Sequence, residues 1–345
     1  MSFVKVFLSI AILSVFSTGI VLPQEIRYID ESKVGDTLQN GAMQYKINDS
    51  LSYVYTRPVP FSFFKHSAQD IYLGTKNVFR KESILPVLGI TGSTLLLIVF
   101  DDKIIDAVHR FGNYIGIPGT DNTLNISPVK NLPIYIPSDI SSGLYYIGDG
   151  LTEILVDGGF YCYGLIKQDN RALTTASELS EGMIAVGVTV QILKHISGRE
   201  DPYERTAPSG RWQWFPSISD YQNHVPHYDA FPSGHLSTAM MTTTIISLNY
   251  PEYKFIKPLC YTLMGLCGFQ MLNNGVHWMS DYPLALAIGY SFGKIAVARG
   301  RMQEVKDNKN KLSSEHKQKI IKSFDIHPTY LGYGAAGLSL NMTFQ

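Results

Sequence analysis

The sequence predicts an all-α fold, a bundle of six helices whose helical core spans about residues 84–298. Two observations support this prediction: helix-length apolar segments recur from Ile84 onward, and no β-rich stretch or internal repeat interrupts them. A chain of 345 residues is also long enough to bury a substantial core. Apolar residues make up 45% of the chain, yet its mean hydropathy is near neutral at +0.02, whereas lipid-facing bundles are usually clearly apolar.

The charge balance and the cysteine content exclude several classes of protein. The 29 basic side chains balance 29 acidic ones, so no basic field indicates a nucleic-acid partner. The three cysteines, Cys162, Cys260 and Cys267, are too few and too scattered for a disulfide framework, and no pair has zinc-ligand spacing.

The first segment, residues 1–23, has the layout of a secretory signal peptide. Lys5 precedes an apolar run from Val6 to Phe16, and small residues follow. An uncleaved anchor helix is the alternative interpretation. Residues 24–83 are polar and mixed with no sustained period, so we expect an N-terminal extension outside the cytoplasm rather than a second catalytic unit.

The first predicted helix runs from Leu85 to Phe100, stops against Asp101 and continues as an amphipathic stretch. The segment from Pro118 to Pro137 is rich in Pro and Asn and predicts a loop. A second helical region, Ile140 to Ile166, is interrupted by glycines.

The third predicted helix, Ser177 to Ile196, opens with a capping-box pattern, Thr175 to Glu178, and ends at Gly198. A long loop rich in Pro, Tyr, Trp and His follows over residues 199–231.

Three further helices are predicted at about Ser233–Leu248, Ile256–Asn274 and Asp281–Ala298. The tail over residues 299–322 is charged and predicts a solvated helix, in a C-terminal segment that reaches residue 345. The last residues alternate weakly, which is typical of a strand or of a loose terminus.

Three motifs stand at helix ends: KHISGREDP (residues 194–202), FPSGH (231–235) and HWMSD (277–281). In the second motif, Ser233 lies where a loop becomes a helix, and Gly234 lets the backbone approach a ligand closely. The free N–H groups and the positive dipole end of that helix favour a phosphate. His235 lies in the first turn and can protonate a leaving oxygen, although an ordinary capped helix with an exposed histidine is the alternative.

In the third motif, His277 lies four residues before Asp281. A carboxylate there can accept the Nδ1 proton, fix the tautomer and leave Nε2 free as a nucleophile. A simple helix cap is the alternative role for Asp281, because Pro283 follows closely. Lys194 of the first motif ends an apolar helix, where a cation suits the helix dipole and is usually structural.

Together these motifs resemble those of the type 2 phosphatidic acid phosphatase (PAP2) superfamily, which includes the vanadium haloperoxidases. The superfamily pattern is a Lys before an Arg-Pro pair, then Pro-Ser-Gly-His, then a Ser-Arg pair followed by His and Asp. Lys194, Pro202, residues 232–235, His277 and Asp281 fall in register with this pattern, and the resemblance spans roughly residues 84–298.

The resemblance implies a helical bundle and a phosphohistidine intermediate, with no metal and no other cofactor. By position, it implies that His277 attacks phosphorus, that Asp281 orients it and that His235 protonates the leaving group. It further implies that the phosphate oxygens are held by Lys194, by the Ser233 hydroxyl and by the Gly234 N–H.

Two positions depart from the pattern. Asp201 stands where the first motif carries Arg, and Met271, preceded by Gln270, stands where the third carries Ser-Arg. Each missing charge-assisted contact is worth about 1.5–3 kcal/mol. A carboxylate about 4 Å from the phosphate would add repulsion on the order of 1–4 kcal/mol.

Other side chains are expected to replace the missing arginines. Arg199 is the first candidate, because it follows the helix end two residues before the expected place. Arg205 and Arg211 in the following loop are weaker candidates. Asn273 and Asn274 are expected to donate hydrogen bonds near the third motif.

We therefore expect a phosphatase that acts on a phosphate monoester or diphosphate, carried by a phosphorylated small molecule or by a lipid phosphate. A catalytically weak or inactive envelope protein of the same superfamily is one alternative, which Asp201 and Met271 support. A vanadate-dependent haloperoxidase is less favoured, because the resemblance implies arginines that hold vanadate. The aromatic loop over residues 202–230 is expected to shape substrate choice.

The expected location is outside the cytoplasm, periplasmic or associated with the cell envelope, either soluble or attached to a membrane surface. The apolar runs are short, and Thr242–Thr244 dilute one of them, which is more typical of core helices than of membrane spans. If all six helices crossed a membrane, the third would end in the cytoplasm and hide the site of an exported phosphatase. An integral inner-membrane protein is the alternative.

Overall fold

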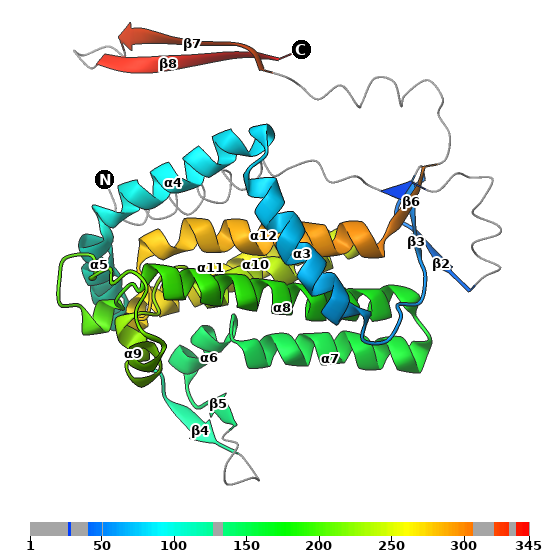
Figure 1. Cartoon of the computed structure of the whole chain (residues 1–345), viewed down its shortest axis with the longest axis horizontal. Coiled ribbons are helices and arrows are strands. Elements are labelled where there is room, and N and C mark those ends of the chain that lie inside the picture. Colours follow the sequence, from blue (N-terminus) through cyan, green and yellow to red (C-terminus); the bar gives the residue numbers. More distant parts are fainter. Residues whose placement is uncertain are drawn as a thin grey trace. The chain divides into compact units, whose positions relative to one another are not determined.

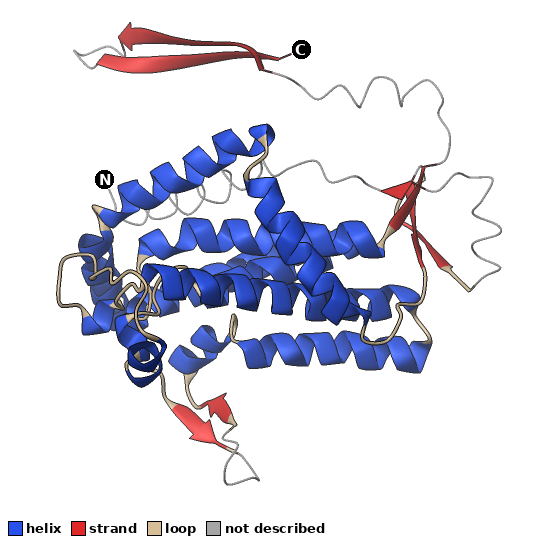
Figure 2. Ribbon diagram, in the orientation of Figure 1, coloured by secondary structure: helices blue, strands red, loops and turns tan. Residues whose placement is uncertain are grey.

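Helices make up most of the described chain, which confirms the predicted all-α fold (Figures 1 and 2). The computed structural model describes residues 27–28, 41–49, 51–126, 134–305, 321–330 and 336–344. The chain divides into two units, residues 1–304 and 305–345. The predicted signal peptide, residues 1–23, lies outside the described residues.

All six predicted helical regions are present, and the first two are each divided. The helices of the bundle are α4 (Ile84–Ile98), α5 (Asp101–Tyr114), α6 (Ile140–Tyr146), α7 (Gly150–Lys167), α8 (Asn170–Ser197), α10 (Gly234–Asn249), α11 (Ile256–Asn274) and α12 (Tyr282–Gly300). The first predicted helix breaks between α4 and α5, and the glycine-interrupted region breaks between α6 and α7. Both breaks occur where the sequence placed acidic residues or glycine, since these residues favour helix ends.

Helix α8 begins seven residues before the predicted start. The Asp169 side chain accepts a hydrogen bond from the Ala172 N–H at 2.8 Å and caps the helix. The predicted capping box is therefore wrong, because the Thr175 hydroxyl lies inside the helix and donates to the Arg171 carbonyl at 2.8 Å. The predicted end is correct: Gly198 has φ 51°, and a Cβ there would lie 2.0 Å from the Gln213 carbonyl oxygen.

The segment predicted as a polar extension contains a helix that the sequence did not predict. Helix α3 (Ser62–Val78) packs against α8 and α12, and the Ser67 hydroxyl donates to the Glu181 carbonyl at 3.0 Å. Before α3, strands β2 (Met43–Lys46) and β3 (Leu51–Tyr55) form an antiparallel pair. They belong to a sheet of order β1-β6-β3-β2, in which β1 is Arg27–Tyr28 and β6 is Met302–Val305.

Helices α10 and α12 form the centre of the bundle and lie side by side (Figure 1). Glycines on α12 permit this close approach, since a Cβ at Gly289 would lie 2.1 Å from the Ser237 carbonyl oxygen. A Cβ at Gly293 would lie 2.8 Å from Thr244. Helix α10 also packs against α8, α7 and α11, so its first turn is held from several sides.

The predicted loops contain short elements. Strands β4 (Thr123–Asn125) and β5 (Tyr135–Pro137) pair within the Pro- and Asn-rich segment. The long loop after α8 contains helix α9 (Ile218–Asn223) and single turns at Pro202–Glu204 and Val225–His227. In the C-terminal unit, β7 (Ile321–Tyr330) and β8 (Ala336–Phe344) form an antiparallel hairpin, while residues 306–320 of the predicted tail helix lie outside the described residues.

The pattern of exposed and buried side chains along the bundle differs from the pattern expected of core helices. Helix α4 with the preceding turn, Lys81–Ile98, is long and apolar enough to cross a membrane, yet only 17% of this segment is buried. Large apolar side chains are exposed on three helices: Leu85, Leu88, Leu95 and Leu96 on α4, Ile154, Leu155 and Ile166 on α7, and Leu259, Leu263 and Leu266 on α11. Several polar side chains are buried instead: Asp70, Glu153, Glu178, Glu181 and Asn249. The expectation that the apolar runs are core helices is therefore wrong for α4.

Candidate active site

Hydrogen bonds between loops bring the three motifs to one place. The Ala230 N–H donates to the Arg199 carbonyl at 3.0 Å, which joins the first motif to the second. The Ser197 hydroxyl donates to the Phe231 carbonyl at 2.8 Å in the same region. The Ser233 N–H donates to the Asp281 carbonyl at 3.3 Å and joins the second motif to the third.

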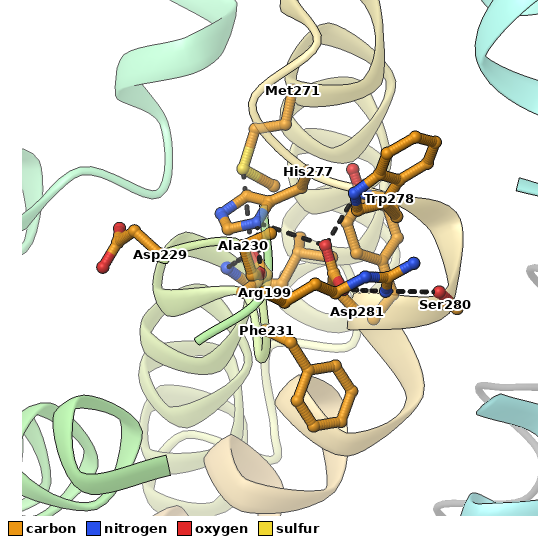
Figure 3. A network of polar contacts seen from close by, with 12 residues as sticks. Arg199, Asp229, Ala230, Phe231, Met271, His277, Trp278, Ser280 and Asp281 are labelled. Atoms are coloured by element: carbon orange, nitrogen blue, oxygen red, sulfur yellow. Dashed lines mark hydrogen bonds and ion pairs between the residues drawn. The ribbon is translucent and has the colours of Figure 1, made fainter. Parts of the chain in front are cut away.

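His277 lies between the end of α11 and the short turn Met279–Asp281 that leads into α12. Its Nδ1 lies 2.7 Å from the Ala230 carbonyl oxygen and 3.5 Å from Asp281 Oδ2 (Figure 3). A carbonyl only accepts hydrogen bonds, so this contact places the proton on Nδ1 and leaves the Nε2 lone pair free. The sequence predicted this tautomer but assigned its stabilisation to Asp281 alone; the backbone carbonyl is the nearer acceptor.

Asp281 is fully buried, and both of its oxygens have donors. Oδ2 accepts from the Trp278 N–H at 2.7 Å, and Oδ1 accepts from Arg199 Nη1 at 2.5 Å. The carboxylate therefore lies beside His277 with its own orientation fixed from two directions.

Arg199 is fully buried between two carboxylates, as Figure 3 shows for Asp281. Its Nη2 donates to Asp101 Oδ2 at 2.7 Å and to the Ser209 carbonyl at 2.8 Å, and its Nη1 also donates to the Ser280 hydroxyl at 2.7 Å. The guanidinium carbon lies 4.8 Å from the Trp212 ring, which adds a cation–π contact. We call Asp101, Arg199 and Asp281 the guanidinium cluster.

The expectation that Arg199 holds the substrate phosphate is therefore corrected. Its two terminal nitrogens are both occupied by protein acceptors, and its side chain has 0% exposure. The sequence spacing located the residue near the site but could not show that two buried carboxylates compete for it.

Lys194 occupies the place predicted for it, beside the start of α10. Its Nζ would lie 4.0 Å from a Cβ built on Gly234, so the ammonium faces the first N–H groups of that helix. In the structure Nζ donates to Asp229 Oδ2 at 2.6 Å. Asp229 Oδ1 accepts a hydrogen bond from the Tyr221 hydroxyl. The Ser233 hydroxyl caps α10 by accepting from the Leu236 N–H at 3.4 Å.

Asp201, which replaces the arginine of the first motif, is 7% exposed, and its Oδ1 has no hydrogen-bond partner. The pKa of Asp201 is raised to about 9. Burial is the main cause and the neighbouring Asp229 acts in the same direction, while Lys194 acts in the opposite direction. Asp201 is therefore a neutral carboxylic acid at pH 7. We call Lys194, Asp201 and Asp229 the ammonium cluster.

The other candidates for replacing the arginines face elsewhere. Met271 is fully buried, and the Ser233 hydroxyl lies 3.7 Å from its sulfur. The Asn273 amide donates to the Ile117 carbonyl at 3.0 Å, and Asn274 Oδ1 accepts from Gln270 at 2.5 Å. The Asn273 donor is therefore engaged by the loop after α5, whereas Nδ2 of Asn274 is buried without a hydrogen-bond partner, so its expected donation to a phosphate stays a prediction.

The two loop arginines were weaker candidates. Arg205 forms ion pairs with Asp102 at 3.2 Å and Asp106 at 3.6 Å on α5, and its side chain is 40% exposed. Arg211 is exposed, and its described hydrogen bonds are made by its backbone: its N–H donates to Glu200 Oε2 at 3.0 Å, and its carbonyl accepts from the Glu200 N–H at 2.9 Å.

His235 lies at the predicted first turn of α10. Its ring centroid lies 4.5 Å from that of Tyr145, with the two rings tilted by 52°, and 6.5 Å from that of His277. Its Nε2 has no hydrogen-bond partner, and Asp149 Oδ2 is 3.9 Å away. The pKa of His235 is lowered to about 3. Burial is the main cause, and the neighbouring His277 and Lys194 act in the same direction. The ring is therefore neutral at pH 7 in the absence of a bound anion.

Three residues near the motifs were missed as site residues. Asp101 was noted only as the end of a helix, and neither Asp229 nor Tyr145 was considered. Asp229 stands two residues before the second motif, which is the one signal in the sequence that could have found it. Asp101 and Tyr145 are distant in sequence from every motif, and only the fold brings them together.

The comparisons with known proteins agree with this geometry. Residues 176–303 match the family model of the PAP2 superfamily. The segment contains all three motifs but not α3 to α7.

Among solved structures, the chain is similar to a transmembrane PAP2-type phosphatidylglycerolphosphate phosphatase from Bacillus subtilis. The sequence identity is 13%, the alignment covers 69% of this chain and 93% of that chain, and the TM-score is 0.35. This similarity is too low to support an argument about function. No curated protein matches the sequence.

Proposed function

We propose that this protein is a phosphatase that hydrolyses a phosphate monoester or diphosphate through a phosphohistidine intermediate on His277. The match of residues 176–303 to the PAP2 superfamily model supports a phosphatase-type function. The observation that carries the mechanism is the contact between Nδ1 of His277 and a carbonyl oxygen 2.7 Å away, which makes Nε2 the nitrogen that can act as the nucleophile. A free Nε2 lone pair beside a lysine and a helix N-terminus is suited to attack a bound phosphoryl group.

In the first step, Nε2 of His277 attacks phosphorus, the bond to the leaving oxygen breaks, and that oxygen receives a proton from His235. Lys194, the Ser233 hydroxyl and the Gly234 N–H stabilise the charge on the equatorial oxygens. In the second step, water attacks phosphorus and breaks the P–N bond, and His235 takes the proton from that water.

His235 must carry a proton for the first step. A bound phosphate dianion beside the ring favours the imidazolium, because an opposite charge within about 4–6 Å stabilises the charged form. We therefore expect activity on substrates with poor leaving groups to rise as the pH falls from 8 toward 6. Activated aryl phosphates should lack this rise, and His235→Ala should remove it.

The predicted absence of a metal cofactor stays a prediction. Among the described residues, no group of three or more His, Cys, Asp or Glu side chains could hold a metal ion. Phosphate release after dialysis against a chelator, compared with release after adding back divalent cations, tests this point.

His277→Ala tests the proposal, because no neighbouring group can replace a covalent nucleophile. Purified wild-type protein should release inorganic phosphate from an aryl phosphate and from a lipid phosphate, and the variant should release none. Circular dichroism should show the same helix content in both. Equal phosphate release by wild type and variant would refute the role of His277.

A second candidate function is that of a binding protein with little or no turnover. One observation favours it: at the two positions where the superfamily has arginine, this chain has a carboxylate, Asp201, and a methionine, Met271, and both are buried. A wild-type protein that binds phosphate or vanadate but releases no product from any phosphate ester would support this candidate and refute the phosphatase.

We further propose that the protein is attached to a membrane through its apolar outer faces, which replaces the soluble alternative. The exposed leucines of α4 and the buried acids inside the bundle support this, because soluble helices usually have the opposite arrangement. Export to the periplasm or cell envelope stays a prediction from the signal-like start. Extraction of membranes with carbonate, high salt and detergent tests the attachment; release by salt alone would restore the soluble interpretation.

A further inference from the structure

Asp101 is the first residue of α5, and it lies outside the segment that matches the superfamily model. Its side chain is fully buried. Oδ2 accepts hydrogen bonds from Arg199 Nη2 at 2.7 Å and from the Ser280 hydroxyl at 2.5 Å, and Oδ1 accepts from the Ser280 N–H at 3.1 Å. These contacts tie α5 to the turn that carries Asp281.

The guanidinium cluster carries an unequal number of charges. Arg199 supplies one positive charge, while Asp101 and Asp281 supply two negative charges, and all three side chains are 0% exposed. If Asp281 were the only carboxylate, the arginine would neutralise it and little field would act on His277. Because Asp101 shares the arginine, one negative charge remains next to the nucleophile.

That remaining charge matters for the chemistry, since attack by Nε2 turns the neutral imidazole into a cation. His277 Nδ1 lies 3.5 Å from Asp281 Oδ2, and buried charges are screened much less than exposed ones. We propose that Asp101 is a positioning residue that acts through Arg199 and Asp281 and stabilises positive charge on His277. This inference rests on the proposed phosphohistidine function.

The charged groups around His277 come from several elements. Asp281 Oδ2 lies 3.5 Å from His277 Nδ1, and the ring centroid of His235 on α10 lies 6.5 Å from that of His277. Lys194 of α8, which pairs with Asp229, acts on the neighbouring His235. Asp201 is protonated at pH 7 and adds no charge. With Asp281 compensated by Arg199, Asp101 is the carboxylate that decides whether the cluster is neutral or negative.

The titration of Asp101 itself agrees with this role. The pKa of Asp101 is raised to about 6. Burial is the main cause, Arg199 acts in the opposite direction, and Asp281 raises the pKa. Above about pH 6 the cluster therefore keeps its negative charge, and below that pH protonation of Asp101 removes it.

The test is the protonation of His277 followed by NMR in full-length protein labelled with ¹⁵N-histidine, with the signals assigned by their loss in His277→Ala. Asp101→Asn should lower the midpoint of His277 protonation by about half a pH unit to one unit, because the cluster becomes neutral. The acidic limb of kcat/KM for an aryl phosphate should move to lower pH by the same amount.

Asp102→Asn is the matched control. Asp102 follows in the same helix, accepts from the Ser209 N–H at 2.9 Å and is 37% exposed, but it pairs with Arg205 rather than Arg199. This variant removes the same charge one residue away, so the midpoint should not move. If Asp101 had only a structural role, Asp101→Asn would lower the stability of the protein and leave the midpoint of His277 protonation in place. That result would overturn the inference.

A measurement on the wild type covers the case in which Asp101→Asn does not fold. The His277 signals should show a second inflection near pH 6, where Asp101 titrates, because coupled groups do not titrate independently. A single transition in the wild type would also overturn the inference. The NMR readouts do not depend on turnover, so a wild type that shows the coupling but releases no phosphate refutes the proposed function instead.

Discussion

The guanidinium cluster and the ammonium cluster each consist of one cation and two carboxylates, yet they are built differently. In the guanidinium cluster all three side chains are 0% exposed, and the arginine bonds to both carboxylates. In the ammonium cluster the Lys194 side chain is 9% exposed and bonds to Asp229, which is 28% exposed. Its second carboxyl, on Asp201, is left with a buried oxygen that has no partner.

This difference separates structural support from capacity to bind. A planar guanidinium presents donors in a fixed fork and can join two carboxylates, whereas an ammonium is a compact charge on a flexible stem. In the guanidinium cluster both terminal nitrogens of Arg199 are engaged, and only its buried Nε has no partner. The ammonium cluster lies beside the start of α10 and is partly exposed, and we propose that a substrate phosphate takes the place of Asp229 on Lys194.

Removing the arginine should have the largest effect. Arg199→Ala leaves Asp101 and Asp281 buried without a cation, and breaking a buried pair in this way costs about 3–5 kcal/mol. We expect loss of the folded state and, with it, of all activity. Urea unfolding followed by circular dichroism measures this. A folded variant with wild-type stability would show that the guanidinium cluster is not structural support.

Removing the lysine should leave the fold intact. Lys194→Met releases Asp229, which water can solvate, and removes a charge-assisted contact to the substrate. We expect kcat/KM to fall about ten- to a hundredfold and inhibition by vanadate to weaken. Urea unfolding of Lys194→Met is compared with that of Arg199→Ala under the same conditions. Unfolding of both variants to the same extent would mean that the two clusters have the same role.

The smallest expected effect is a gain in stability in Asp201→Asn. The folded pKa of Asp201, about 9, lies above its ordinary value of 3.8, so the folded state keeps a proton that the unfolded chain releases. The wild type therefore loses stability as the pH rises between these two values. Asparagine does not ionise, so at pH 8 the variant should melt about 2–6 °C higher.

The pH dependence supplies the control for this third prediction. As the pH falls well below the ordinary value of 3.8, the carboxyl becomes protonated in the unfolded as well as the folded wild type, so the two melting temperatures should converge. A variant that melts at the same temperature as the wild type at pH 8 would show that Asp201 is ionised, and the ammonium cluster would then carry more negative charge than the structure indicates.

The helices were predictable because their apolar runs, glycines and prolines act locally. Helices α10, α11 and α12 begin and end within about two residues of the predicted positions, since Ser233 and Pro283 act within a single turn. Helix α3 was missed, because the residues that it buries against α8 and α12, Ser67 and Asp70, are polar and give no apolar signal. The start of α8 was misplaced because a local capping pattern competed with the true cap at Asp169.

The site was predictable as far as its motifs reach. Sequence spacing brought His235, His277 and Lys194 to one place, since each sits at a helix end that the bundle brings together. The role of Arg199 was not predictable, because its partner Asp101 is distant in sequence and carries no motif. Charge pairing across a fold depends on which helices are neighbours, and one sequence does not contain that information.

The position of Asp101 has a consequence for anyone who would express the catalytic part alone. A fragment limited to residues 176–303 would retain the three motifs and every proposed catalytic side chain. It would lack Asp101, so Arg199 would be left with one carboxylate and an empty place beside Ser280. It would also lack Asp70, which Arg299 binds, and the Asp169 cap of α8. We therefore expect the shortest piece of this protein that folds to be longer than its recognisable motifs and to include α3.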